Sequence, residues 1–158
     1  MNPVKPAARA GFGLSLKGRA LRHLAAREHS RAELERKLAP HEETPGQLAQ
    51  VLDELQAKDF ISEARVVASV VHQKAPRQGA ARIRQVLQFK GIAPDAIAQA
   101  LADLRGSELE RARALWQRRF GAPATEAAER ARQARFLAAR GFSGEVVRRV
   151  LRADIDEA

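Results

Sequence analysis

The chain has 158 residues, of which 45% are hydrophobic, 4% aromatic and none cysteine, and its 28 Lys+Arg against 19 Asp+Glu give a formal net charge of +9. The apolar content argues against wholesale disorder, and the lack of cysteine excludes a disulfide framework and thiolate metal sites. No run approaches the roughly 20 apolar residues of a membrane span, so a cytoplasmic protein is predicted. The composition is rich in alanine, leucine and arginine but poor in sheet-favouring residues, which predicts an all-α fold.

Proline, glycine and capping residues divide the chain into about nine helices, which group as three tandem three-helix repeats. The N-terminal run is basic and lacks a continuous apolar stretch, so it is predicted to be a flexible arm and not a secretory signal. The predicted order is an arm over 1–15, three-helix repeats over 16–61, 62–105 and 106–153, and an acidic tail over 154–158.

The first repeat opens with a short helix predicted over Arg19–Arg27. Ser30 followed by Glu33 forms a capping box, in which hydroxyl and carboxylate each bond a free backbone N–H, so a second helix starts there. That helix stops at Pro40.

Thr44 followed by Pro45 predicts an N-cap with proline at the first position of the third helix. Apolar residues then recur at the i, i+3, i+4, i+7 spacing of a half-buried helix. They are Leu48, Val51, Leu52 and Leu55.

The second repeat is predicted to begin at Ser62, with a valine-rich helix that ends before Pro76. Its second helix runs from about Gly79 to Lys90, with Ile83 and Leu87 facing inward. The third helix begins at Pro94, since proline fits the first helical position.

In the last repeat, Ser107 with Glu110 is interpreted as a second capping box that starts the seventh helix. The eighth helix is predicted from Thr125 through Arg140, and the ninth from Ser143.

One junction recurs three times. Lys58-Asp59-Phe60, Lys90-Gly91-Ile92 and Arg140-Gly141-Phe142 each join a basic residue, a residue able to adopt the left-handed conformation, and a large apolar residue. This order is typical of a helix C-cap, because the cation meets the carbonyl end of the helix and the apolar side chain packs back. The separations of the three copies are unequal, which predicts divergent repeats.

The sequence contains no recognisable active site. Its four histidines form no HExxH motif and no i, i+4 pair, so no metal or other cofactor is predicted. Trp116 lies on the apolar stripe of its helix and is predicted to be a core residue. We therefore expect a protein that binds and does not catalyse.

The distribution of charge indicates where such binding occurs. Between Glu63 and Asp95 there is no acidic residue, whereas six are basic. A solvated surface usually mixes both signs, so this stretch favours an anionic partner. The candidate binding residues are Lys74, Arg77, Arg82, Arg84 and Lys90 here, Arg132, Arg135 and Arg140 around the eighth helix, and, as a lesser pair, Arg31 and Arg36.

Four segments stand out by their order and spacing: the run from His29 to Leu38, the Leu52–Leu55 segment with Phe60-Ile61, the segment Gly79–Ile83 with Leu87 and Lys90–Ile92, and the closing run from Phe136 to Ser143. Together they resemble the bacterial RecX regulatory proteins. The resemblance extends from about residue 16 to 152. Glu63 stands where the family usually has aspartate, and Val67 near a position where it usually has an aromatic residue.

The resemblance implies tandem three-helix repeats in an elongated, curved arrangement. It also implies a protein that binds the RecA recombinase, typically as its filament on single-stranded DNA, and inhibits its ATPase, coprotease and strand-exchange activities in recombination and the SOS response. Apart from the resemblance, we expect a monomer. The alternative is a general nucleic-acid-binding helical protein without a specific protein partner, which the salt dependence of binding would distinguish.

Overall fold

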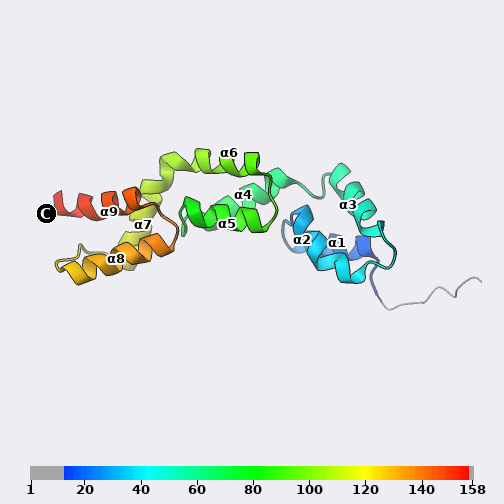
Figure 1. The fold of residues 1–158 in the computed structure, drawn as a ribbon, viewed down its shortest axis with the longest axis horizontal. Helices are drawn as coiled ribbons and strands as arrows, with labels where there is room; N and C mark the ends of the chain where they lie inside the picture. Colours follow the sequence, from blue (N-terminus) through cyan, green and yellow to red (C-terminus); the bar gives the residue numbers. More distant parts are fainter. Residues whose placement is uncertain (1–12, 157–158) are drawn as a thin grey trace, which may run out of the picture.

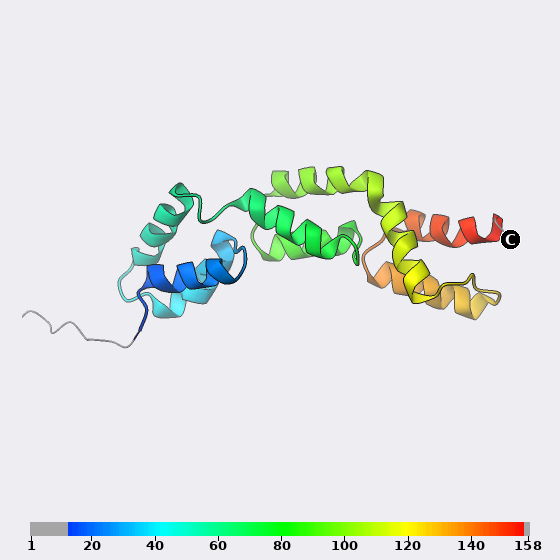
Figure 2. The ribbon, with the colours of Figure 1, turned by 180° about the vertical axis from the view of Figure 1, so that it is seen from behind.

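The computed structural model describes the backbone of residues 13–156 and the side chains of residues 13–152. Within this range the chain forms nine α-helices and no strand, so the all-α prediction is confirmed. The helices lie in three groups along one elongated body, with the N-terminal group at one end and the C-terminal group at the other (Figures 1 and 2). The arm predicted over 1–15 falls mostly outside the described residues.

We call the three groups module 1, module 2 and module 3. Module 1 contains α1 (Leu16–Ala26), α2 (Arg31–Leu38) and α3 (Gln47–Ala57). Module 2 contains α4 (Glu63–Lys74), α5 (Ala80–Phe89) and α6 (Pro94–Leu104). Module 3 contains α7 (Glu108–Arg119), α8 (Ala127–Ala139) and α9 (Gly144–Asp156), so part of the predicted acidic tail belongs to the last helix. The predicted repeat limits remain predictions.

Each module buries its own apolar stripe. Leu34, Leu52 and Leu55 are fully buried in module 1, together with neighbours from all three of its helices. Ile83 and Leu87 form the centre of module 2, as their spacing predicted. Three separate cores, and not one shared core, stabilise the chain, which is how repeat proteins remain elongated.

Several helix starts follow the sequence signals. The capping box is complete, since Glu33 N donates to Ser30 Oγ (3.1 Å) and Ser30 N donates to Glu33 Oε1 (3.1 Å). Ser62 caps α4 through Arg65 N, and Pro94 occupies the first turn of α6. These predictions are confirmed.

Two starts in module 1 were predicted wrongly. Helix α1 begins at Leu16, three residues before Arg19, because Ser15 Oγ accepts from Gly18 N and caps it. Thr44 is not an N-cap. It begins a turn closed by Gln47 N→Thr44 O (3.1 Å), in which Gly46 has φ +86°, so α3 starts only at Gln47.

Two starts in module 3 also differ from the prediction. Ser107 forms no capping box, because a 3₁₀ turn over Arg105–Ser107 connects α6 directly to α7 and leaves no free helix start. The Ser107 hydroxyl instead donates to Leu104 O (3.0 Å). Helix α8 begins at Ala127, after Glu126 and not after Thr125.

All three predicted junctions are helix C-caps with a left-handed residue. Asp59, Gly91 and Gly141 have φ of 63°, 72° and 92°. In each junction the next residue donates a 6→1 hydrogen bond to the preceding helix, as in Ile92 N→Leu87 O (3.1 Å). The copies are not equivalent in the fold, however. The first joins modules 1 and 2, whereas the other two join the second and third helices within a module, and this explains the unequal separations.

The second helices of the modules follow one another end to end, in the order α8, α5, α2 (Figure 1). Gly79 N at the start of α5 donates to Arg140 O at the end of α8 (2.8 Å). The Ser30 hydroxyl at the start of α2 donates to Lys90 O at the end of α5. Each junction therefore joins the positive end of one helix dipole to the negative end of the next.

Arginines from the first helix of the following module reinforce both junctions. Arg65 Nε of α4 donates to Glu28 Oε1 in the α1–α2 loop (3.0 Å). Arg111 Nη1 of α7 donates to Ala75 O (2.7 Å) and Gln78 O (2.8 Å) in the α4–α5 loop. No helix of the described part of the chain is long and apolar enough to cross a membrane.

Candidate partner-binding surface

Positive charge increases along the chain from module to module. Residues 13–61 hold eight basic and eight acidic side chains, residues 62–104 six and three, and residues 105–152 twelve and five. Module 1 is therefore neutral, and the basic excess belongs to modules 2 and 3. This agrees with the acid-free stretch between Glu63 and Asp95, which favoured an anionic partner for this part of the chain.

The ion pairs, in contrast, are concentrated in module 1. Of the nine pairs among the described side chains, every one except Arg132–Glu129 (3.5 Å) involves a residue of module 1. Because almost no carboxylate in modules 2 and 3 reaches an arginine, the cations of these two modules are largely uncompensated. Such a surface attracts an anionic partner.

Four of these uncompensated arginines converge where modules 2 and 3 meet. They border a hollow of about 350 Å³ that also contains Leu115 and Phe136. We call this group the arginine cluster; it consists of Arg77, Arg118, Arg119 and Arg140. None of the four forms an ion pair within the described residues.

An aromatic ring orders part of the arginine cluster. The guanidinium carbons of Arg140 and Arg119 lie 5.0 and 5.8 Å from the centre of the Phe136 ring. Arg118 Nη2 donates to Pro76 O (3.2 Å). Contact with a ring and with a carbonyl restrains these side chains without neutralising them, so their positive charge remains available.

Among the predicted binding residues, the structure brings Arg77 and Arg140 together in the arginine cluster. Arg82 and Arg84 are exposed on α5, and neither forms an ion pair within the described range. Lys74 lies apart from them, in a separate hollow of about 310 Å³ beside Lys90. On α8, Arg135 is exposed, and Arg132 pairs weakly with Glu129.

Lys90 and Arg31 have partners inside the protein. The Lys90 ammonium pairs with Glu33 (3.0 Å) and is only 19% exposed. Arg31 pairs with Asp53 (2.7 Å) and Glu35 (3.1 Å). We therefore leave both residues out of the proposed binding surface. Lys90 instead stabilises the junction of modules 1 and 2, and Arg31 stabilises module 1.

Arg36 has a different neighbour. Its guanidinium carbon lies 4.5 Å from the centre of the Phe89 ring, which belongs to module 2. Phe89 is 72% exposed, so the pair forms an outward-facing contact between the two modules.

Glu33 is the most strongly perturbed acid of the inter-module contacts. Burial alone would raise the pKa of its carboxyl group, but hydrogen bonds from Arg27, Ser30 N and Lys90 outweigh burial and lower the pKa to about 2. Glu33 therefore stays ionised and holds the junction between modules 1 and 2.

The sequence interpretation missed Arg118 and Arg119. Their signal was present, because residues 111–125 contain four arginines and no acid. Their convergence with Arg77 depends on how two modules pack, which a local pattern does not reveal. Trp116 is 2% exposed and donates to Gln133 Oε1 (2.9 Å), which confirms it as a core residue.

Each of the three modules matches a model of a known protein family. The family models for the first, second and third three-helix domains of RecX match residues 17–55, 62–101 and 107–151. The matched segments fall in modules 1, 2 and 3 in the same order.

Curated relatives agree with these matches. The protein named Regulatory protein RecX from Leptothrix cholodnii is 65% identical over 139 residues, covering 88% of each chain. Its namesake from Ralstonia nicotianae is 50% identical and covers 87% of each.

Two solved structures share the fold. The crystal structure of RecX from Lactobacillus salivarius superposes with a TM-score of 0.74 at 19% identity, covering 90% of this chain and 96% of that one. A second, described as regulatory protein RecX, gives 0.71 at 23% identity, covering 85% and 70%. On the strength of the three matched domains and the close relatives, the chain belongs to the RecX family of regulatory proteins.

Proposed function

We propose that this protein binds the RecA recombinase assembled on single-stranded DNA and inhibits its ATPase, coprotease and strand-exchange activities. It acts in the cytoplasm as a monomer, without catalysing a reaction, and so modulates recombination, DNA repair and the SOS response. Membership of the RecX family of regulatory proteins supports a regulatory role for this protein. The observation that carries the binding site is the arginine cluster where modules 2 and 3 meet, since none of its four guanidinium groups pairs with a carboxylate among the described side chains.

An elongated body suits a polymeric target. If each module contacts a successive protomer of a filament, every contact after the first is effectively intramolecular, so weak contacts add up to firm binding. A protein bound in this way across several protomers blocks filament growth or resists the protomer motions that accompany ATP turnover.

The second candidate function is general nucleic-acid binding. The arrangement that favours it is an aromatic ring, Phe136, beside uncompensated arginines. Single-stranded nucleic acids bind to surfaces that combine stacking rings with positive charge.

The first test is the DNA-dependent ATPase of RecA from the same species. We expect the ATPase rate to fall as the protein is added to filaments, at ratios below one per protomer. An unchanged rate at several-fold excess over filament sites would contradict the proposal.

Salt separates the two candidate functions. Binding that depends on about six to ten phosphates should weaken roughly 10³- to 10⁵-fold between 50 and 200 mM salt. We expect inhibition of the ATPase to persist at 200 mM salt while binding to bare single-stranded DNA is lost. Loss of both together would favour the general nucleic-acid binder.

A further inference from the structure

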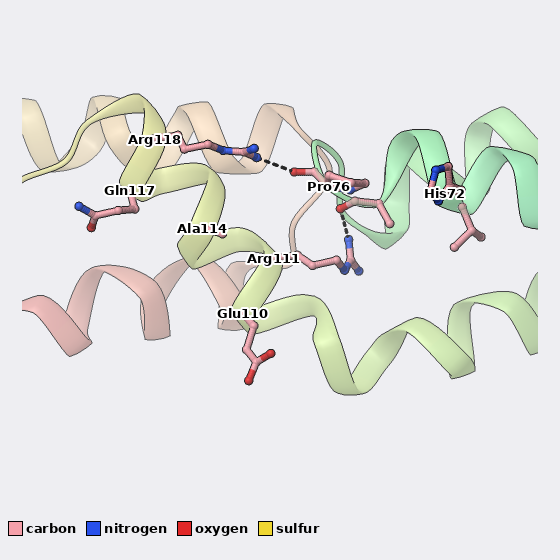
Figure 3. A pocket seen from close by; sticks show the side chains of 9 residues that line it. His72, Pro76, Glu110, Arg111, Ala114, Gln117 and Arg118 are labelled. Atoms are coloured by element: carbon pink, nitrogen blue, oxygen red, sulfur yellow. Dashed lines mark hydrogen bonds between the residues drawn. The ribbon is translucent and has the colours of Figure 1, made fainter.

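A second hollow adjoins the arginine cluster, on the other side of Arg118. It has a volume of about 700 Å³ and lies between α4 and the α4–α5 loop of module 2 and α7 of module 3 (Figure 3). Its floor is apolar and consists of Val71, Ala75, Pro76 and Ala114. We call it the apolar hollow. Its volume falls within the range of roughly 300–1,000 Å³ typical of ligand-binding sites.

The position of the apolar hollow is fixed by the junction of modules 2 and 3. Arg111 and Arg118 extend from α7 to the carbonyl groups of Ala75 and Pro76, and these hydrogen bonds hold the two walls together (Figure 3). The hollow is therefore preformed, so a partner would not bear the cost of ordering it.

Charge is distributed unevenly along the rim. Arg118 at one end is shared with the arginine cluster, whereas Glu110 lies at the other end of the same face of α7 (Figure 3). An occupant with negative charge is thus favoured most at the Arg118 end, because Glu110 partly offsets the positive charge of its neighbour Arg111 at the other end.

We propose that the apolar hollow and the arginine cluster together bind a segment of a protein partner that carries apolar side chains followed by acidic ones. The apolar side chains cover Val71, Ala75 and Ala114, and the acidic side chains meet Arg118 and the remaining arginines. Nucleic acid fits this surface less well, because its phosphates gain nothing from an apolar floor and would approach Glu110. The inference rests on the proposed function and specifies the class of partner at that site.

The absence of cysteine allows a direct test with the full-length protein. Ala114 is exposed, so Ala114→Cys can carry a photoreactive benzophenone at the floor of the hollow. The labelled protein is irradiated with RecA filaments from the same species on single-stranded DNA. We expect a cross-link to one RecA peptide that contains apolar and acidic residues. Cross-links to DNA alone, or no cross-link, would overturn the inference.

Inhibition of the RecA ATPase provides a second readout. Ala114→Gln and Arg118→Gln should each raise the concentration needed for half-inhibition at least fivefold. The matched controls Ala102→Gln on α6 and Arg113→Gln on α7 change exposed residues outside the hollow, and they should leave that concentration unchanged.

The outcomes distinguish the two proposals. If the wild-type protein fails to inhibit, the proposed function fails. If it inhibits and the hollow variants inhibit equally well, only the inference about the hollow fails.

Discussion

At the scale of single residues, Glu33 combines local and long-range roles. Its carboxylate accepts from Ser30 N, which completes the capping box, and pairs with Arg27 (2.7 Å) and Lys90 (3.0 Å). The sequence predicted the first role, because a capping box is a local pattern. It assigned Lys90 to a partner surface, because no local pattern indicates a pair that joins two modules.

Replacing Glu33 should make stability depend less on pH. Because the folded state lowers the pKa of Glu33 to about 2, the ionised form stabilises the fold. This contribution is complete above the usual pKa near 4.5 and is lost as the pH falls through about 2. We expect Glu33→Gln to lower the free energy of unfolding by about 2 kcal/mol at pH 7, measured by urea denaturation.

The difference between wild type and Glu33→Gln should narrow between pH 4.5 and 2. Glu35→Gln is the control, since among the described side chains Glu35 forms only an exposed i, i+4 pair with Arg31, worth about 0.5 kcal/mol or less. An equal loss of stability in both variants would contradict the role assigned to Glu33.

At the scale of helices and junctions, close packing of glycines joins modules 2 and 3. A Cβ atom on Gly79 would lie 2.4 Å from Gly141 O, and one on Gly141 would lie 2.4 Å from Arg82 Cγ. The N-terminal end of α5 can therefore approach the end of α8 only because both positions lack a side chain.

We expect Gly79→Ala to destabilise the protein by about 2 kcal/mol or more, because the added methyl group overlaps backbone atoms that belong to the other module. Gly106→Ala is the matched control, since nothing lies within 4 Å of its Cβ position. Urea denaturation of both variants measures the difference. A Gly79→Ala protein as stable as the control would show that the junction is looser than described.

Prediction from the sequence succeeded where the signal was local. Apolar spacing identified the nine helices, and Ser30, Ser62 and Pro94 marked helix starts correctly. It failed at Ser107, because the same residues that resemble a capping box also fit a 3₁₀ turn that continues one helix into the next. The arginine cluster was found only in part, since Arg77 and Arg118 meet through packing between modules.

At the scale of the whole molecule, the two junctions differ in their share of ion pairs. The pairs Arg65–Glu28 and Lys90–Glu33 join module 1 to module 2, in addition to the Ser30–Lys90 hydrogen bond and the close approach of Gly91 to Ala32. Among the described side chains no ion pair joins module 2 to module 3; hydrogen bonds to backbone carbonyls and glycine packing hold these two modules, and the helical stretch from Pro94 to Arg119 crosses the junction. Salt screens the more exposed pair Arg65–Glu28 more strongly than the largely buried pair Lys90–Glu33, and it leaves backbone contacts largely intact.

High salt should therefore loosen module 1 selectively. Spin labels on Gln50→Cys and Ala98→Cys report the first junction, and labels on Ala98→Cys and Arg149→Cys report the second; all three positions are exposed. In about 1 M NaCl, we expect the distance distribution of the first pair to broaden and that of the second to stay narrow, measured by pulsed electron paramagnetic resonance. Equal broadening of both would contradict the distinction.

The three modules also differ in their charge. Module 1 is neutral and internally paired, whereas modules 2 and 3 carry the uncompensated arginines, the apolar hollow and the hollow of the arginine cluster. We therefore propose that modules 2 and 3 form the binding part and that module 1 adds reach along a filament.

We propose that inhibition of RecA depends on the arginine cluster, and the decisive measurement is the ATPase of RecA filaments titrated with two charge variants. Arg77→Glu with Arg140→Glu alters the cluster, whereas Arg105→Glu with Arg149→Glu changes two exposed arginines outside it by the same total charge. We predict that the first variant no longer inhibits, with unchanged helical circular dichroism, and that the second inhibits like the wild type. Equal inhibition by both variants would show that the arginine cluster is not the inhibitory site.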